Sequence, residues 1–194
     1  MNFFLILISA AFINNYVLMQ FLGMCPFFGV SKRTETAIGM GLSVIFVMVI
    51  ATAITYPFYI LILLPNDLVY LQTIVFILCI ASIVQFLETF MKKTFNSLYR
   101  MLGVYLPLIT TNCSILGVTL INIQDNYTFP GAIVNSIGAG FGFMLAIVLL
   151  AGLREKYDGD QDIHVFFKGF PLALFSAGLM SIAFMGFQGL VIGR

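Results

Sequence analysis

The sequence predicts an all-α integral membrane protein of six transmembrane helices, arranged as two inverted three-helix repeats. Of its 194 residues, 61% are hydrophobic and 9% are charged, whereas about one residue in four is charged in soluble domains. About 20 apolar residues can cross a bilayer. The charged residues leave six uncharged stretches of that order, at residues 1–31, 36–66, 68–87, 101–124, 126–153 and 169–193. The chain should therefore contact membrane lipid, and its net charge of +1 implies no nucleic-acid partner.

Basic residues occur in alternate connections, and this pattern predicts the orientation. The connections after the first, third and fifth stretches contain Lys and Arg, and those after the second and fourth contain none. These basic residues are Lys32, Arg33, Lys92, Lys93, Arg100, Arg154, Lys156 and Lys168. Basic connections stay on the cytoplasmic side, so we expect a multi-pass protein of the inner (cytoplasmic) membrane with both termini outside. Residues 1–31 lack the basic start and cleavage site of a secretory signal, so we expect a retained helix there.

A weak internal similarity suggests a duplication. The segment CPFFGV from Cys25 resembles CSILGV from Cys113. The segment IGMGLSVIFVMVIA at 38–51 likewise resembles IGAGFGFMLAIVLLA at 137–151. Small residues also recur in membrane helices for packing alone, so chance similarity is the alternative explanation.

The duplication would divide a single membrane domain, residues 1–194, into repeat one (1–96) and repeat two (97–194). Each repeat would hold three spans. Because three is odd, the second repeat must enter the membrane from the opposite side. Inverted repeats of this kind place functional sites near mid-depth, where the two halves meet.

Cys25 and Cys113 would be equivalent in the two repeats, and both have helix-interrupting residues nearby. These residues are Gly23, Pro26 and Gly29 in the first half and Pro107 and Gly117 in the second. Proline has no N–H, and glycine tolerates unusual dihedral angles, so we expect broken helices around both cysteines. A break would let the two thiols lie at one depth. Backbone N–H groups freed by a break need acceptors within the protein, and cysteine sulfur would serve.

The residues themselves leave several roles open for Cys25 and Cys113. The two could be packing residues, a disulfide, or ligands of zinc or of an iron–sulfur cluster. Zinc would need two further ligands, and the only histidine, His164, lies in a polar connection. A cluster needs four thiolates, so a second chain would have to supply two. Cys79 has no flanking glycine or proline and is interpreted as a structural apolar residue.

Other polar residues within the apolar stretches have simpler explanations. Glu88 could be functional, as intramembrane carboxylates often are, but its spacing also permits an ordinary ion pair with Lys92, which we favour. Buried amides need partners, so we expect several side chains to bond the broken backbone or one another. They are Asn14, Asn15, Thr110, Thr111 and Asn112.

Four segments resemble one family of membrane proteins. They are NNYVLMQFLGMCPFFGVSKRTETAIGMG (14–41), YLPLITTNCSILGV (105–118), AGLREK (151–156) and AGLMSIAFMGFQGLV (177–191). The family comprises the A-type subunit of the Rnf complex, a membrane-bound ferredoxin:NAD oxidoreductase, and its counterpart, the E-type subunit of the sodium-translocating NADH:quinone reductase. The segment MCPFFGVSK is more similar to the Rnf member.

The resemblance implies six helices in an inverted repeat and a homologous partner of opposite topology, the E-type subunit of the Rnf complex. Cys25 and Cys113 would join two cysteines of that partner in binding an intramembrane [2Fe–2S] cluster. The chain would be a non-catalytic electron-transfer subunit working with the B-, C-, D- and G-type subunits. Electron flow from ferredoxin to NAD⁺ would be coupled to translocation of Na⁺ or H⁺.

Two function classes compete with this interpretation. A small-solute secondary transporter would also have inverted repeats with broken helices. It would, however, need polar groups lining a central cavity, and the sequence offers mainly amides, threonines and Glu88. A membrane scaffold without a cofactor is the other alternative. Both would contain no iron.

Overall fold

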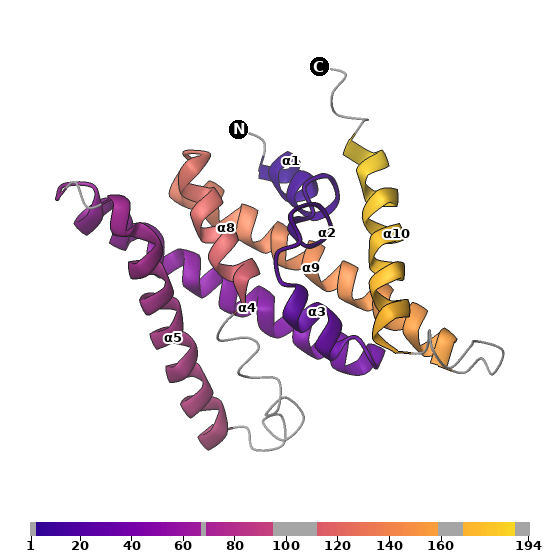
Figure 1. Cartoon of the computed structure of the whole chain (residues 1–194). Helices are drawn as coiled ribbons and strands as arrows, with labels where there is room; N and C mark the ends of the chain where they lie inside the picture. The colour runs from indigo at the N-terminus through magenta and orange to yellow at the C-terminus, as the bar shows by residue number, and fades with distance from the viewer. Residues whose placement is uncertain (1–2, 67–68, 95–111, 159–168, 189–194) are drawn as a thin grey trace.

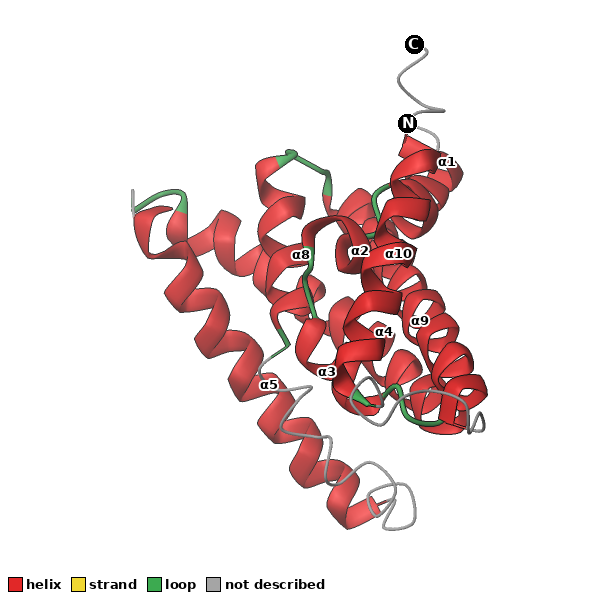
Figure 2. Cartoon of the chain, turned by 45° about the vertical axis from the view of Figure 1, so that its right-hand side comes forward, coloured by secondary structure: helices red, strands yellow, loops and turns green. Residues whose placement is uncertain are grey.

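The computed structural model describes residues 3–66, 69–94, 112–158 and 169–188, and the regular structure in these ranges is all helical (Figures 1 and 2). This confirms the predicted all-α class. Several residues used in the sequence analysis lie outside the described ranges. They are Arg100, Pro107, Thr110, Thr111, His164 and Lys168.

The helices follow the uncharged stretches in order. The first stretch forms α1 (Phe3–Ile8), a π-helical turn η1 (Ser9–Ile13), α2 (Tyr16–Gln20) and α3 (Met24–Val30). Helix α4 (Thr34–Phe58) continues into the π-helical turn η2 (Tyr59–Leu63), and a 3₁₀ turn η3 (Val69–Leu71) leads into α5 (Gln72–Thr94). The remaining helices are α8 (Cys113–Gln124), α9 (Phe129–Asp158) and α10 (Phe170–Gln188).

Each of the six uncharged stretches contains an apolar helical segment. Among the described residues, three segments have the length and composition to cross a membrane, at Thr34–Leu63, Val69–Thr89 and Phe129–Tyr157. The other three are shorter, at Phe3–Ile13, Cys113–Gln124 and Phe170–Gly186. Six crossings therefore remain a prediction. The first stretch is broken as expected, at residues 14–15 and 21–23.

Helices α4 and α9 form the centre of the molecule and run antiparallel (Figure 1). An added Cβ on Gly41 of α4 would meet Met144 of α9, and one on Gly140 of α9 would lie 2.7 Å from Cγ1 of Ile45. In the alignment of the two repeats, Gly41 corresponds to Gly140 and Ile45 to Met144. The two contacts are therefore interchanged, which is the pattern expected across a two-fold axis.

Each end of this helix pair has a hydrogen bond from the later part of one helix to the start of the other. At one end, the backbone N–H of Thr34, the first residue of α4, donates to Glu155 near the end of α9 (2.8 Å). At the other end, the hydroxyl of Tyr56, near the end of α4, donates to the carbonyl of Tyr127, just before α9 (2.9 Å). In the same register Tyr56 corresponds to Glu155, so each helix contacts the start of its counterpart.

Small residues of α9 also let the broken first stretch approach closely. An added Cβ on Gly138 would lie 2.8 Å from the carbonyl oxygen of Leu7, and one on Gly142 would lie 2.9 Å from that of Ala11. These glycines are one helical turn apart and lie on a face different from that of Gly140. Glycines spaced four residues apart are a common means of close helix packing in membranes.

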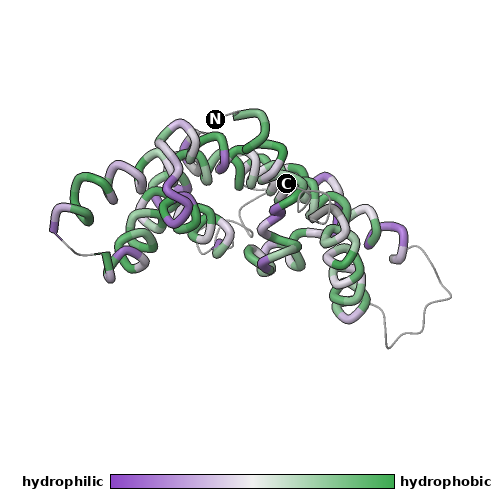
Figure 3. Tube along the Cα trace, turned by 90° about the horizontal axis from the view of Figure 1, so that it is seen from above, coloured by the Kyte–Doolittle hydropathy of each residue, from purple (hydrophilic) through white to green (hydrophobic). Residues whose placement is uncertain are grey.

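The core lies between α4, α9 and the broken first stretch. Its largest fully buried side chains include Phe27, Met40, Met48, Phe143 and Ile147. Helix α5, in contrast, lies at one side of the molecule (Figures 1 and 2) and exposes Ile74, Leu78 and Phe86. Apolar residues colour most of the helical trace in Figure 3. A surface this apolar suits contact with lipid or with other membrane chains.

The close contact at Gly41 predicts a position-specific effect of alanine. Because its Cβ would overlap Met144, Gly41→Ala should destabilise the chain by about 1–3 kcal/mol. Gly39→Ala, two residues earlier, has nothing within 4 Å of the added Cβ and should be neutral or slightly stabilising. Thermal unfolding of the full chain in detergent measures both. Equal effects of the two substitutions would contradict the packing described here.

Candidate metal centre at Cys25 and Cys113

Both predicted cysteines lie in the first turn of a helix. Cys113 is the first residue of α8, and the side chain of the preceding Asn112 caps this helix by accepting from the Ser114 N–H at 3.0 Å. Cys25 is the second residue of α3, which follows Gly23 in the left-handed region at φ 84°. Such a φ favours glycine, so the sequence allows the chain to turn sharply just before Cys25.

One hydrogen bond joins the break before Cys25 to the start of α8. The backbone N–H of Gly23 donates to Sγ of Cys113 at 2.9 Å. Residue 23 precedes Cys25 by two positions, so the sulfur of one cysteine lies against the backbone that leads into the other. The expectation that cysteine sulfur accepts an N–H freed by a helix break is confirmed by this bond.

The packing around Gly23 leaves no room for a larger residue. An added Cβ would lie 3.0 Å from both the Phe143 ring and Cβ of Ser114, and 3.3 Å from Oδ1 of Asn112. Gly23 is itself buried. The turn before Cys25 can therefore lie against the start of α8 only because residue 23 is a glycine, which has the required dihedral angles and no side chain.

The two thiols are free and their side chains are exposed on this chain. Among the described residues no three His, Cys, Asp or Glu side chains gather in a group that could hold a metal ion. Thiolate ligands suit iron–sulfur clusters and other soft metal centres. The donor set thus fits half of a four-thiolate site, with the open side available to ligands from another chain.

Asn112 adds a further polar group beside Cys113. Its Nδ2 is buried and has no hydrogen-bond partner in the described part of the chain, although its Oδ1 is used in capping α8. The capping bond fixes which end of the amide carries the oxygen, because Ser114 needs an acceptor. An N–H donor without a partner is thus present next to Cys113.

A model of the family described as "Rnf-Nqr subunit, membrane protein" matches residues 3–191. The chain belongs to the Rnf-Nqr family. It is 57% identical over 193 residues to the A-type subunit of the Na⁺-translocating ferredoxin:NAD⁺ oxidoreductase complex of Acetobacterium woodii, with all of both chains covered. It is 51% identical to the A-type subunit of the ion-translocating oxidoreductase complex of Syntrophotalea carbinolica and 52% identical to that of Pasteurella multocida, each with at least 98% of both chains covered.

Family membership confirms the predicted all-α membrane class and the resemblance found in the sequence. The ligand role of Cys25 and Cys113 stays a prediction. In this Rnf-Nqr chain Cys79 lies half-buried on α5. Glu88 is also half-buried on α5, and its pairing with Lys92 stays a prediction because the Lys92 side chain lies outside the described part.

The amides behave largely as expected for an Rnf-Nqr chain with broken helices. Oδ1 of Asn15 caps α2 by accepting from the Val17 N–H at 3.1 Å, and its Nδ2 donates to the Gly142 carbonyl at 2.9 Å. Asn14 is exposed, and its amide lies 3.5 Å from the Ser9 hydroxyl. The first break is therefore held in part by side chains of the break itself.

A buried polar cluster that was not predicted from the sequence joins four helices. Asn135 donates to Asn122 (2.7 Å) and to the Tyr16 hydroxyl (3.4 Å), Asn122 donates to Ser136 (3.1 Å), and the hydroxyls of Ser136 and Thr52 lie 2.7 Å apart. The signal was available, since Asn122 and the pair Asn135–Ser136 flank the fourth connection within uncharged stretches. Polar side chains in such stretches gain most by bonding to one another.

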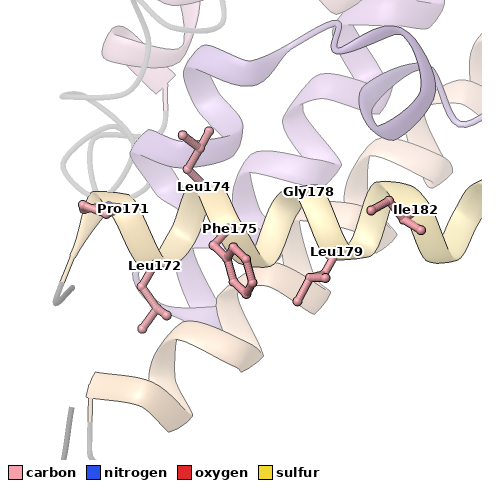
Figure 4. Close-up of a pocket in the computed structure, with 7 residues that line it drawn as sticks. All are labelled: Pro171, Leu172, Leu174, Phe175, Gly178, Leu179 and Ile182. Atoms are coloured by element: carbon pink, nitrogen blue, oxygen red, sulfur yellow. The ribbon is translucent and has the colours of Figure 1, made fainter. Parts of the chain in front are cut away.

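A concave apolar surface lies along α10 and suits lipid contact. Pro171, Leu172, Leu174, Phe175, Gly178, Leu179 and Ile182 line a space of about 680 Å³. All of them come from one helix, and their apolar side chains point away from it on more than one side (Figure 4). These residues supply no polar group for chemistry.

The cap on α8 gives a test of the geometry at Asn112. Asn112→Ala should lower the stability of the full chain by about 1 kcal/mol, because it removes the acceptor for Ser114. Asn112→Ser should retain most of that stability, since serine is also a good cap and Nδ2 has no partner to lose. Thermal unfolding in detergent distinguishes the two variants. A serine variant as unstable as the alanine variant would show that Nδ2 makes a stabilising bond.

Proposed function

We propose that this chain is the A-type membrane subunit of an ion-translocating ferredoxin:NAD⁺ oxidoreductase complex. In it, Cys25 and Cys113 supply two of the four ligands of a [2Fe–2S] cluster. The other two thiolates come from a homologous E-type subunit of opposite topology. The observation that carries this proposal is the Gly23 N–H bond to Cys113 Sγ, which holds the turn before Cys25 against Cys113 at the start of α8.

The residues of this chain are suited to holding half of such a cluster. Both thiols are exposed and can meet ligands from outside. The N–H of Gly23 already bonds one sulfur, and N–H donors to sulfur are among the features that set the reduction potential of a cluster. When bound, the cluster would supply a one-electron carrier within the membrane.

The interchanged contacts of α4 and α9 support the inverted repeat on which this arrangement depends. Gly41 and Gly140 each receive a side chain of the opposite helix, and the two helices run antiparallel. Six crossings would complete two repeats. The homologous E-type subunit would then present an equivalent pair of cysteines from the other side.

The placement of basic residues supports the proposed orientation. Thr34 and Glu155 are bonded to each other, so Lys32 and Arg33 lie at the same end of the α4–α9 pair as Arg154 and Lys156. This end would face the cytoplasm. Both termini would then lie outside an inner (cytoplasmic) membrane, and the B-, C-, D- and G-type subunits would complete the electron path.

Chemistry at the cluster would belong to the complex as a whole. This chain would act as a non-catalytic electron-transfer subunit, and electron transfer would be coupled to movement of Na⁺ or H⁺. A small-solute transporter is the second candidate, since broken helices in inverted repeats suit it too. Iron in the purified complex separates the two, because a transporter needs none.

The ligand role predicts the effect of removing each thiol. Cys25→Ala or Cys113→Ala should abolish the electron paramagnetic resonance signal of the reduced intramembrane cluster in the assembled complex. Either change should also stop ferredoxin-dependent NAD⁺ reduction, because three thiolates cannot complete the usual ligand set. Cys79→Ala serves as the matched control and should retain both. Persistence of the signal in either of the first two variants would refute the assignment.

A further inference from the structure

The helix that carries Cys25 is too short to hold its own position. Helix α3 has seven residues, and most of the stability of a helix in a protein comes from the packing of its face against other elements. Its placement therefore depends on contacts with other elements. Phe27 and Val30 are buried, and the Phe28 ring packs against Phe170 of α10 with the ring centroids 5.3 Å apart.

Arg154 of α9 makes the polar contact at the end of α3. Its Nη1 donates to the carbonyl of Phe28 and to the hydroxyl of Ser31, each at 2.9 Å. The Phe28 carbonyl is one of the last four in α3, which lack a partner within the helix. A positive charge there also opposes the negative end of the helix dipole. Ser31 is fully buried and Arg154 is half-buried.

The next residue, Glu155, carries the opposite charge and contacts the start of α4. Its carboxylate accepts from the backbone N–H of Thr34 at 2.8 Å and from the Thr34 hydroxyl at 3.1 Å. Arg33, which precedes α4, provides no side-chain cap, so the carboxylate takes that role. A negative charge suits the start of a helix, although Glu155 is exposed and contributes less than Arg154.

Arg154 and Glu155 thus match the charges of the two helix ends that they contact. The cation lies at the end of α3, the anion lies at the start of α4, and the turn at residues 31–33 lies between them. At the other end of the α4–α9 pair, the corresponding contact from Tyr56 to Tyr127 is uncharged. Among the described residues, charged contacts of this kind occur on the Cys25 side.

We propose that Arg154 is a positioning residue for Cys25, with Glu155 as its weaker companion. Arg154 fixes the end of α3 against α9 and so sets where the Cys25 sulfur lies relative to Cys113. The functional meaning of this inference rests on the proposed ligand role of Cys25. The structural part, that Arg154 holds α3 in place, is independent of any iron.

Hydrogen–deuterium exchange of the assembled complex, read by mass spectrometry, tests the structural part. Arg154→Met keeps the length of the side chain but removes its donors, and it should speed exchange over residues 24–31 by about tenfold. Exchange over 113–124 in α8 should change by less than about twofold. Arg154→Lys, which keeps the charge and a donor, should bring α3 to within about threefold of the unmodified chain. Lys156→Met is the matched control and should leave α3 unchanged.

Each other outcome also decides the question. Unchanged exchange in α3, or an equal rise in α3 and α8, would overturn the inference, because Arg154 would then have no role or only a general one. Should the Arg154→Met complex fail to accumulate, Ser31→Ala replaces it, since this change removes one of the two acceptors. It should speed α3 exchange by about two- to threefold, and no change would overturn the inference.

Spectra of the same samples test the functional part. The g-values of the reduced cluster should shift in Arg154→Met, return toward the original in Arg154→Lys, and stay constant in Lys156→Met. Faster exchange in α3 with an unchanged cluster spectrum would overturn the positioning of Cys25. Faster exchange in a complex that holds no cluster at all would instead refute the proposed function and leave the Arg154 contact standing.

Discussion

The structure depends on one constraint, which is that backbone polar groups inside a membrane need partners within the protein. The first stretch breaks twice, and groups of the second half bond to it along its length. Asn15 donates to the Gly142 carbonyl, and the Ser181 hydroxyl donates to the Leu18 carbonyl at 2.6 Å. Gly23 donates its N–H to Cys113, and Arg154 donates to the Phe28 carbonyl. The broken stretch is therefore stable only against the other half of the chain.

Helices α4 and α9 provide the rigid element against which this stretch packs. Val44 of α4 and Phe143 of α9 are fully buried. The mutual contact of the two helices is close, because Gly41 and Gly140 present no side chain to each other's helix. Glycine inside a helix costs about 0.5–1 kcal/mol relative to alanine. Close packing must offset that cost, since lipid tails are as apolar as the side chains and burial alone drives little association. Tight contact in the centre and irregular backbone beside it are thus two parts of one arrangement.

Composition and the uncharged lengths predicted the class of fold, and Gly23 and Pro26 predicted the break before Cys25. The family was predicted from the resemblance of four segments. The sequence also predicted that cysteine sulfur would accept a freed N–H. The cluster around Asn122 and Asn135 was not predicted, because two amides on different helices bond only when tertiary packing brings them together. The role of Arg154 was missed for a similar reason. In the sequence, Arg154 contributed only to the count of basic residues that predicted orientation. Its hydrogen bonds depend on where α3 ends relative to α9.

A broken first helix would also let two thiols so far apart in the sequence share the proposed site. On an unbroken first helix, Cys25 would lie about 10 Å from Lys32 along the axis, close to the charged end, whereas Cys113 lies near the middle of its stretch. Phe21, in the left-handed region at φ 56°, ends α2, and Gly23, at φ 84°, precedes α3. The residues just before Cys25 therefore lie against the first residue of α8. The price of this geometry is a cysteine on a helix too short to position itself. A longer helix could be positioned by packing along its length, whereas α3 is also held at its end by Arg154. The break at Gly23 would allow the proposed site, and the Arg154 bond to the Phe28 carbonyl would hold the short helix that the break creates.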